Sequence, residues 1–128
     1  MADERYARGW EKLQELAGKD GEHVIETVRE LSPDLARLVV EFGYGDVYTR
    51  PGLDLRQRQM IAIAALTALG GAEAQLDYHV RIGLNVGLEP AEIVETVVHC
   101  TPFVGFARAL NAARAVKRAF SARGVSLD

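Results

Sequence analysis

The stretch LRQRQMIAIAALTALGGAEAQLDYHVRIGLNVG, residues 55–87, decides the fold. Its first part, residues 55–69, is rich in Ala, Ile and Leu on more than one face, which predicts a buried central helix. Two consecutive glycines break this helix, and a second helix is predicted from about 72 to 86, closed by another glycine. The two segments form a predicted helical hairpin, and His79 lies on its second helix.

The residues before this hairpin are also predicted to be helical. The spacing of apolar residues predicts an N-terminal helix over about 3–17 that stops at Gly18, with further helical sequence after it. Ser32 is placed to cap a helix whose first residue is Pro33. That helical part ends near Gly45, and a connector with strong turn chemistry leads to the central hairpin.

The residues after the hairpin give a last helical region. It begins at Pro90 and extends to about residue 120, and Pro102 and Gly105 are expected to kink or split it. No convincing strand alternation interrupts these helices. The sequence therefore predicts an all-α protein, with one domain over residues 1–128 and about six helices.

Composition narrows the class of protein. The chain has 128 residues, of which 48% are hydrophobic and 26% charged, as expected for a soluble globular domain with its own core. Its net charge of −3, without a clustered basic surface, argues against nucleic-acid binding. The charged opening predicts no secretory leader, and no apolar run is long enough to span a membrane. A single cysteine excludes an internal disulfide, so we expect a cytoplasmic protein.

Three residues are candidates for acid–base chemistry. His79 lies on the apolar hairpin, and His99 follows Glu95 by four residues, so that carboxylate and imidazole share one helix face. A neighbouring carboxylate can orient a histidine ring for general acid–base work. The alternatives are that His79 is a hydrogen-bonded core residue and that Glu95 and His99 form a helix-surface pair. Spacing alone leaves both interpretations open.

The spacing of residues gives weaker support to a metal site, a nucleophilic cysteine or an anion-binding site. The same three side chains are acceptable metal ligands, but no H-x-x-H or H-E-x-x-H spacing is present, so no metal is predicted. Cys100 lies in an apolar helix, where a thiol is more often a small buried hydrophobe than a nucleophile. Arg50 and Arg81 carry guanidinium groups that could select an anionic substrate, or they are ordinary surface residues.

The order of motifs between about residues 20 and 120 resembles that of the carboxymuconolactone decarboxylase family. The matching motifs are Gly45–Asp46–Val47, Arg50–Pro51–Gly52–Leu53–Asp54, Arg58, His79–Val80–Arg81, Leu84–Asn85–Val86–Gly87, and the helix with Glu92–Ile93, Glu95 and His99. The resemblance implies the all-helical alkyl hydroperoxidase D-like fold, commonly assembled as homo-trimers or hexamers. One branch of the family contains thiol peroxidases with a C-x-x-C motif four residues before the histidine. Ala72 and Gln75 occupy those two thiol positions here, so a peroxidase or disulfide reductase is disfavoured.

The other branch decarboxylates 4-carboxymuconolactone to the 3-oxoadipate enol-lactone during protocatechuate breakdown, in the β-ketoadipate pathway. Loss of CO₂ leaves a carbanion whose negative charge is delocalised into the lactone carbonyl. Because the lactone itself is the electron sink, the resemblance implies no cofactor. A positioned donor would stabilise the resulting oxyanion, and an acid would return a proton to carbon. We assign His79 as proton donor or oxyanion partner, Arg50 and Arg81 as carboxylate-binding residues, and Glu95 with His99 as orienting or proton-relay residues.

Aromatic residues are further candidates for binding the substrate. Tyr44 and Tyr48 either line the site or pack the N-terminal helix against the body. The family's Tyr-x-Gly-x-Pro segment is replaced here by a sequence that begins at Phe103 and lacks both the tyrosine and the proline. A pocket lined by it would be more apolar and would favour a larger or more apolar substrate. A third function class, a non-catalytic oligomeric binding protein, stays open beside lyase and peroxidase.

Overall fold

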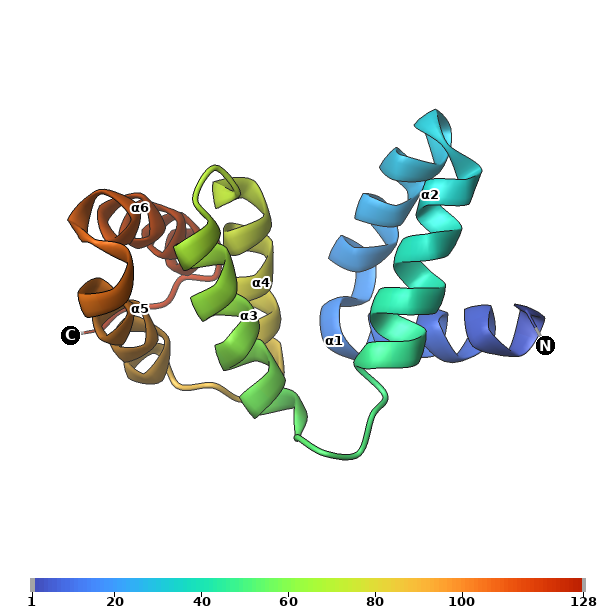
Figure 1. Ribbon diagram of the computed structural model, residues 1–128, viewed down its shortest axis with the longest axis horizontal. Helices are drawn as coiled ribbons and strands as arrows, with labels where there is room; N and C mark the ends of the chain where they lie inside the picture. The colour runs from blue at the N-terminus through green and yellow to red at the C-terminus, as the bar shows by residue number, and fades with distance from the viewer. Residues whose placement is uncertain (1, 128) are drawn as a thin grey trace. The chain divides into compact units, whose positions relative to one another are not determined.

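The computed structural model describes residues 2–127, and it is built of helices (Figure 1). Six α-helices and one π-helix are present in this range, and no strand is found there, which confirms the all-α prediction. The chain folds into two compact units, Met1–Asp54 and Leu55–Asp128. The single domain assigned to residues 1–128 stays a prediction.

The first unit contains α1 (Ala2–Leu31), α2 (Pro33–Leu38) and the π-helix η1 (Val39–Val47). α1 is bent at Gly18, whose positive φ of 54° is one that side chains with a Cβ rarely adopt. The predicted stop at this glycine is therefore a kink, after which the helix resumes and lies against α2 and η1 (Figure 1). The predicted cap is confirmed, because the Ser32 hydroxyl accepts a hydrogen bond from the Leu35 amide.

Two glycines let α1 and η1 approach each other closely. A Cβ on Gly9 would lie 2.0 Å from the carbonyl oxygen of Val40, and a Cβ on Gly45 would lie 2.9 Å from that of Arg5. These contacts involve backbone atoms, which cannot move aside as the end of a side chain can. The crossing of the two helices therefore depends on glycine at both positions.

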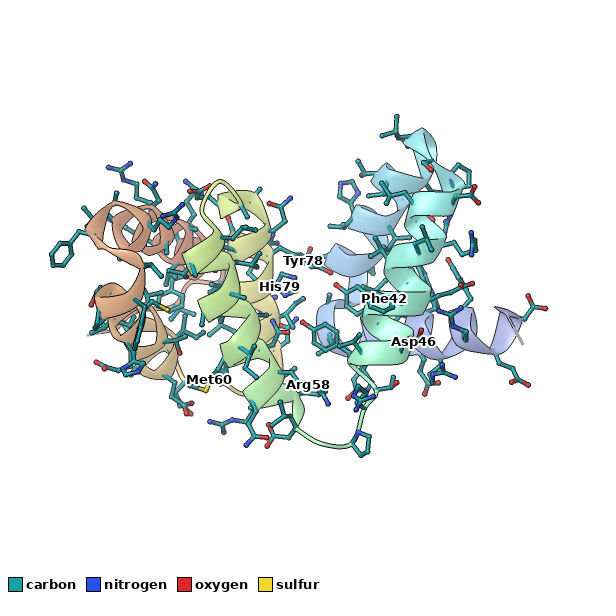
Figure 2. The ribbon with its side chains drawn as sticks, viewed as in Figure 1. Phe42, Asp46, Arg58, Met60, Tyr78 and His79 are labelled. Carbon is teal, nitrogen blue, oxygen red and sulfur yellow. The ribbon has the colours of Figure 1, made fainter. Side chains whose placement is uncertain are left out.

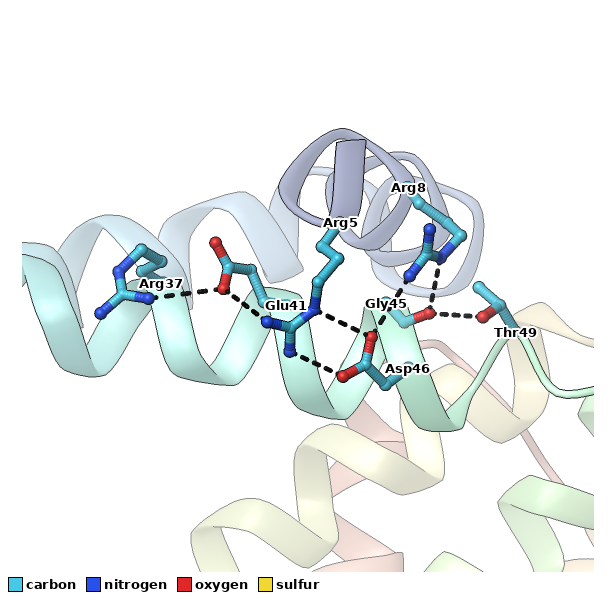
Figure 3. A network of polar contacts seen from close by, with 7 residues as sticks. All are labelled: Arg5, Arg8, Arg37, Glu41, Gly45, Asp46 and Thr49. Atoms are coloured by element: carbon cyan, nitrogen blue, oxygen red, sulfur yellow. Dashed lines mark hydrogen bonds and ion pairs between the residues drawn. The ribbon is translucent and has the colours of Figure 1, made fainter. Parts of the chain in front are cut away.

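Ion pairs hold the same two helices together (Figure 3). Arg5 donates to both carboxylate oxygens of Asp46, at 3.2 and 2.7 Å, and Arg8 reaches the same carboxylate at 3.2 Å. The hydrogen bond from Arg5 lowers the pKa of Asp46 below its usual value. Glu41 is buried on η1 and lies 3.5 Å from Arg5 and 3.4 Å from Arg37. Within this unit Asp46 is thus a structural residue that joins η1 to α1.

The second unit contains four α-helices. They are α3 (Leu55–Leu69), α4 (Glu73–Asn85), α5 (Pro90–Val104) and α6 (Phe106–Ala122). α3 and α4 form the predicted hairpin, and α3 also packs against α5 and α6 (Figure 1). The apolar core comprises Ile63, Leu76, Val80, Leu88, Ile93, Val97, Ala109, Ala112, Ala115, Val116, Ala119 and Phe120. The small residues of α6 allow this helix to lie close to its neighbours.

The last helical region is split, as predicted, at one of its two breaking residues. Pro102 lies inside α5, whereas Gly105 separates α5 from α6 with a φ of 84°. At the other end of α5, Glu92 accepts a hydrogen bond from the Glu89 amide at 2.8 Å. Arg56 at the beginning of α3 donates to both oxygens of Glu92, at 2.7 and 2.8 Å. Glu92 therefore has a structural role, which is to cap α5 and to form this ion pair with α3.

α3 is less buried than its sequence predicts. Its buried positions in this chain are Gln59, Ile63 and Thr67, which follow one another at four-residue spacing along one face. Ile61 and Leu69, on other faces, are 55% and 66% exposed.

A membrane span needs both sufficient length and sufficient hydropathy, and none of the helices among the described residues meets both requirements.

Candidate active site around His79

His79 lies on α4 (Figure 2). It is partly buried, and a residue of α3 holds it by hydrogen bonds. The side-chain nitrogen Nε2 of Gln59 lies 3.1 Å from Nδ1 of the imidazole and 3.0 Å from the carbonyl oxygen of His79. Gln59 itself is completely buried. The ring of Tyr78 meets the imidazole edge-on, with centroids 5.2 Å apart. His79 is thus fixed in place from two sides.

Burial also sets the charge of this histidine. It lowers the pKa of His79 from 6.5 to about 4, because the imidazolium ion loses solvation inside the protein. At neutral pH the ring is therefore uncharged. A neutral imidazole offers one N–H donor and one acceptor nitrogen, and it can donate a hydrogen bond without first binding a proton.

The same pKa predicts how stability depends on pH. The unfolded chain binds a proton at His79 near pH 6.5 and the folded chain only near pH 4, so the unfolded state holds more protons between these values. The contribution of His79 to the free energy of unfolding is therefore present above pH 6.5 and is lost as the pH falls toward 4. Proton NMR of the imidazole should give a midpoint near 4; a midpoint near 6.5 would contradict this environment. His79→Gln should remove that part of the pH dependence of urea unfolding.

Arg81 forms an ion pair with a neighbouring acidic residue on the same helix. Its Nε lies 3.2 Å from the carboxylate of Asp77, one helical turn earlier, and Arg118 of α6 approaches the same carboxylate at 3.8 Å. Residues two positions apart on a helix do not share a face, so Arg81 and His79 project in different directions from α4. The structure shows Arg81 in an ion pair, and its role toward a substrate stays a prediction.

Glu95, His99 and Phe103 lie along α5, where all three are exposed. The His99 ring packs beside Phe103, with centroids 5.8 Å apart, and Phe103 is 78% exposed. Within residues 2–127, no hydrogen bond or ion pair joins Glu95 to His99. Both side chains are thus at the helix surface, but the surface pair predicted as the alternative is not formed between them in this chain. Their catalytic roles stay predictions.

The remaining candidates belong to the first unit. Tyr44 is buried on η1 and stacks on Tyr48, with ring centroids 5.3 Å apart. Arg50 follows η1 and is exposed, with its amide donating to the carbonyl oxygen of Val47 at 3.1 Å. The stacked tyrosines have a clear packing role, and the binding roles of these three residues stay predictions.

The thiol and metal alternatives gain no support from the geometry. Cys100 is a free, buried thiol, and burial raises its pKa, which disfavours the reactive thiolate. Among residues 2–127, no three His, Cys, Asp or Glu side chains are grouped so as to hold a metal ion.

Gln59 is the site residue that the sequence analysis missed. It belongs to the buried face of α3, four residues before Ile63 and eight before Thr67. A glutamine on the helical stripe of a buried core residue needs a hydrogen-bonding partner, because leaving its amide unsatisfied is costly. That stripe was the available signal, but it does not say which residue the partner is.

Comparison with known proteins agrees with the motifs around His79. Residues 33–118 match the carboxymuconolactone decarboxylase family. The chain is 30% identical to 4-carboxymuconolactone decarboxylase of Acinetobacter baylyi, covering 97% of this chain and 92% of the relative. It is 31% identical to nitrosuccinic acid decarboxylase of Metarhizium robertsii, over 66% of this chain and 60% of the relative. These relatives support a decarboxylase-type enzyme. The chain belongs to the carboxymuconolactone decarboxylase family.

Proposed function

We propose that the protein catalyses the cofactor-free decarboxylation of a carboxylated lactone, 4-carboxymuconolactone or a related substrate, in the cytoplasm. The observation that carries this proposal is the uncharged, partly buried imidazole of His79, held by Gln59 on the side of Nδ1. The similarity to a named 4-carboxymuconolactone decarboxylase over nearly the whole chain supports the choice of substrate. The enol-lactone product would feed the breakdown of aromatic compounds.

The reaction requires an electron sink, a group that accepts the electron pair released when the carboxylate leaves as CO₂. When the carbon–carbon bond to the carboxylate breaks, CO₂ leaves and the pair of electrons moves into the unsaturated lactone, placing negative charge on its carbonyl oxygen. A hydrogen bond from neutral His79 would stabilise that oxygen more strongly than it stabilises the uncharged carbonyl, which lowers the barrier. A proton from water or from a protein acid then returns to carbon, giving the enol-lactone. In this account His79 is the oxyanion partner.

The other candidates have supporting roles in the proposal. Arg50 and Arg81 bind the carboxylates of an anionic substrate. Arg81 either keeps its ion pair with Asp77 when the substrate binds or exchanges Asp77 for the substrate carboxylate. Glu95 and His99 relay the proton that returns to carbon. Tyr44, Tyr48 and Phe103 contact the apolar part of the substrate, which favours a larger or less polar lactone than 4-carboxymuconolactone itself.

An ultraviolet assay of lactone turnover tests the proposal. The purified protein, supplied with a chelator and without thiol, should convert 4-carboxymuconolactone or an alkyl-substituted analogue with release of one CO₂ per molecule. Failure of the folded protein to turn over any member of this panel would overturn the proposal. Consumption of hydrogen peroxide with a thiol donor would instead favour the peroxidase class, and binding without turnover would favour a non-catalytic ligand-binding protein.

We also propose that the chain forms a homo-trimer or hexamer. Phe103, Phe106 and Leu110, at the junction of α5 and α6, are 78%, 77% and 60% exposed, and large apolar side chains grouped in this way are typical of interfaces. Phe106→Glu is expected to reduce the assembly to smaller species without unfolding it, because the side chain makes little contact within its own chain. Light scattering after size exclusion measures this. An unchanged mass for this variant would exclude this surface as the interface.

A further inference from the structure

We propose that Gln59 is a positioning residue that holds His79 in the tautomer with its hydrogen on Nε2, so that Nε2–H is the donor presented to a ligand. The proposal rests on the proposed function for its catalytic consequence. Its structural part, the tautomer, rests on the hydrogen bonds between α3 and α4 alone.

The carbonyl oxygen of His79 identifies the amide nitrogen of Gln59. A carbonyl oxygen can only accept, so the side-chain atom 3.0 Å from it must be the NH₂ group and cannot be the amide oxygen. The same atom lies 3.1 Å from Nδ1 of the ring. Because an NH₂ group can only donate, Nδ1 must offer its lone pair, and the hydrogen of the neutral ring is on Nε2.

Burial makes this arrangement difficult to reverse. Gln59 is 0% exposed, on the face of α3 that also carries the buried Ile63 and Thr67, so bulk water is kept from its amide. Moving the ring hydrogen to Nδ1 would bring two donors together. Turning the amide over would bring its oxygen against the carbonyl oxygen of His79. Either change breaks a hydrogen bond between α3 and α4 in a buried setting, which is costly.

The tautomer determines what the ring can do. With hydrogen on Nε2, the nitrogen that Gln59 does not contact is a donor, as an oxyanion or a carboxylate requires. With hydrogen on Nδ1, Nε2 would present a lone pair and would repel the same negative oxygen. Gln59 therefore acts through His79 and need not touch the substrate.

Nitrogen-15 NMR of the labelled imidazole tests the tautomer without any substrate. The chain has three histidines, and the His79→Gln spectrum identifies the signals that belong to His79. The protein at pH 7 should show a protonated Nε2 and an unprotonated Nδ1. Hydrogen on Nδ1, or a mixture of both tautomers, would overturn the proposal. Because this spectrum is taken on the parent chain, the result does not depend on whether a variant folds.

Two substitutions test the role of Gln59. Gln59→Glu keeps the shape but places a carboxylate oxygen against Nδ1, so a hydrogen should appear on Nδ1. Because this carboxylate also raises the pKa of the ring, the tautomer and kcat are both measured at a pH above that pKa. Gln59→Met fills a similar volume without a donor and should give both tautomers. With an active substrate, kcat of Gln59→Glu should fall by at least about 100-fold, and Gln59→Met, retaining part of the correct tautomer, should fall less.

The outcomes separate this proposal from the proposed function. A switched tautomer with unchanged kcat would show that Gln59 is only structural and would overturn its catalytic role. An Nε2–H signal in a protein that decarboxylates no lactone would refute the proposed function while confirming the tautomer.

Discussion

Replacement of His79 by alanine is expected to lower kcat for the lactone by about 10²- to 10³-fold, the usual effect of removing one oxyanion-stabilising donor. The reason is that the neutral imidazole would interact more strongly with the charged oxygen of the transition state than with the ground-state carbonyl. KM should change much less than kcat. Steady-state kinetics in the ultraviolet assay measure both constants.

His79→Gln is the matched variant for this prediction. A glutamine amide can offer one neutral N–H donor near the position of the imidazole, so part of the lost kcat should return. Far-ultraviolet circular dichroism must show that both variants are folded, since alanine removes the ring that Gln59 contacts. A folded His79→Ala protein with the kcat of the parent would refute the assignment of His79 as oxyanion partner.

Gly9→Ala is expected to lower the free energy of unfolding by about 3 kcal/mol, the upper end of typical overpacking costs. The added Cβ would lie 2.0 Å from the carbonyl oxygen of Val40, so α1 and η1 must separate. Their separation would also strain the ion pairs from Arg5 and Arg8 to Asp46. Urea unfolding followed by circular dichroism gives the change.

Gly43→Ala is the control in the same helix pair. Gly43 lies on η1, and a Cβ there meets no atom within 4 Å. This substitution should leave stability unchanged or raise it by up to about 1 kcal/mol, because alanine favours helix over glycine. Equal destabilisation by the two substitutions would contradict this account, because only the Cβ at position 9 meets the backbone of another helix.

The central hairpin was the most predictable part of the fold. α3 has the predicted bounds 55–69, and α4 agrees within a residue of the predicted 72–86, because glycines mark the ends of strongly apolar segments. Ser32 and Pro33 similarly mark the beginning of α2. Local residue preferences suffice for such features, since capping and positive φ depend on a few neighbouring residues.

The π-helix η1 was not predictable from this sequence. Nothing in the sequence of residues 39–47 distinguishes a π-helix from an α-helix, and the wider turn appears where the backbone packs across α1 at Gly9. Contacts distant in sequence also decided the environment of the candidate site residues. Helical spacing placed Glu95 and His99 on one face, but it did not show that this face is exposed.

The interaction between Gln59 and His79 is another contact that the sequence alone could not predict. They are twenty positions apart, on either side of the turn between α3 and α4, so no spacing rule on one helix pairs them. His79 could be selected from its motif, but its charge and tautomer follow from burial and from the amide of Gln59. Both chemical properties needed for the proposed role thus come from packing.

The pH dependence of kcat tests the central claim, that His79 acts as a neutral donor, most directly. Between about pH 5.5 and 8 the account predicts no loss of kcat through ionisation of His79, because its ring stays uncharged above its pKa of about 4. The measurement is repeated with His99→Gln, so that a pH dependence shared by both proteins cannot come from His99. A kcat that falls tenfold per pH unit above about 6.5 in both proteins would identify an imidazolium acid and would contradict the account.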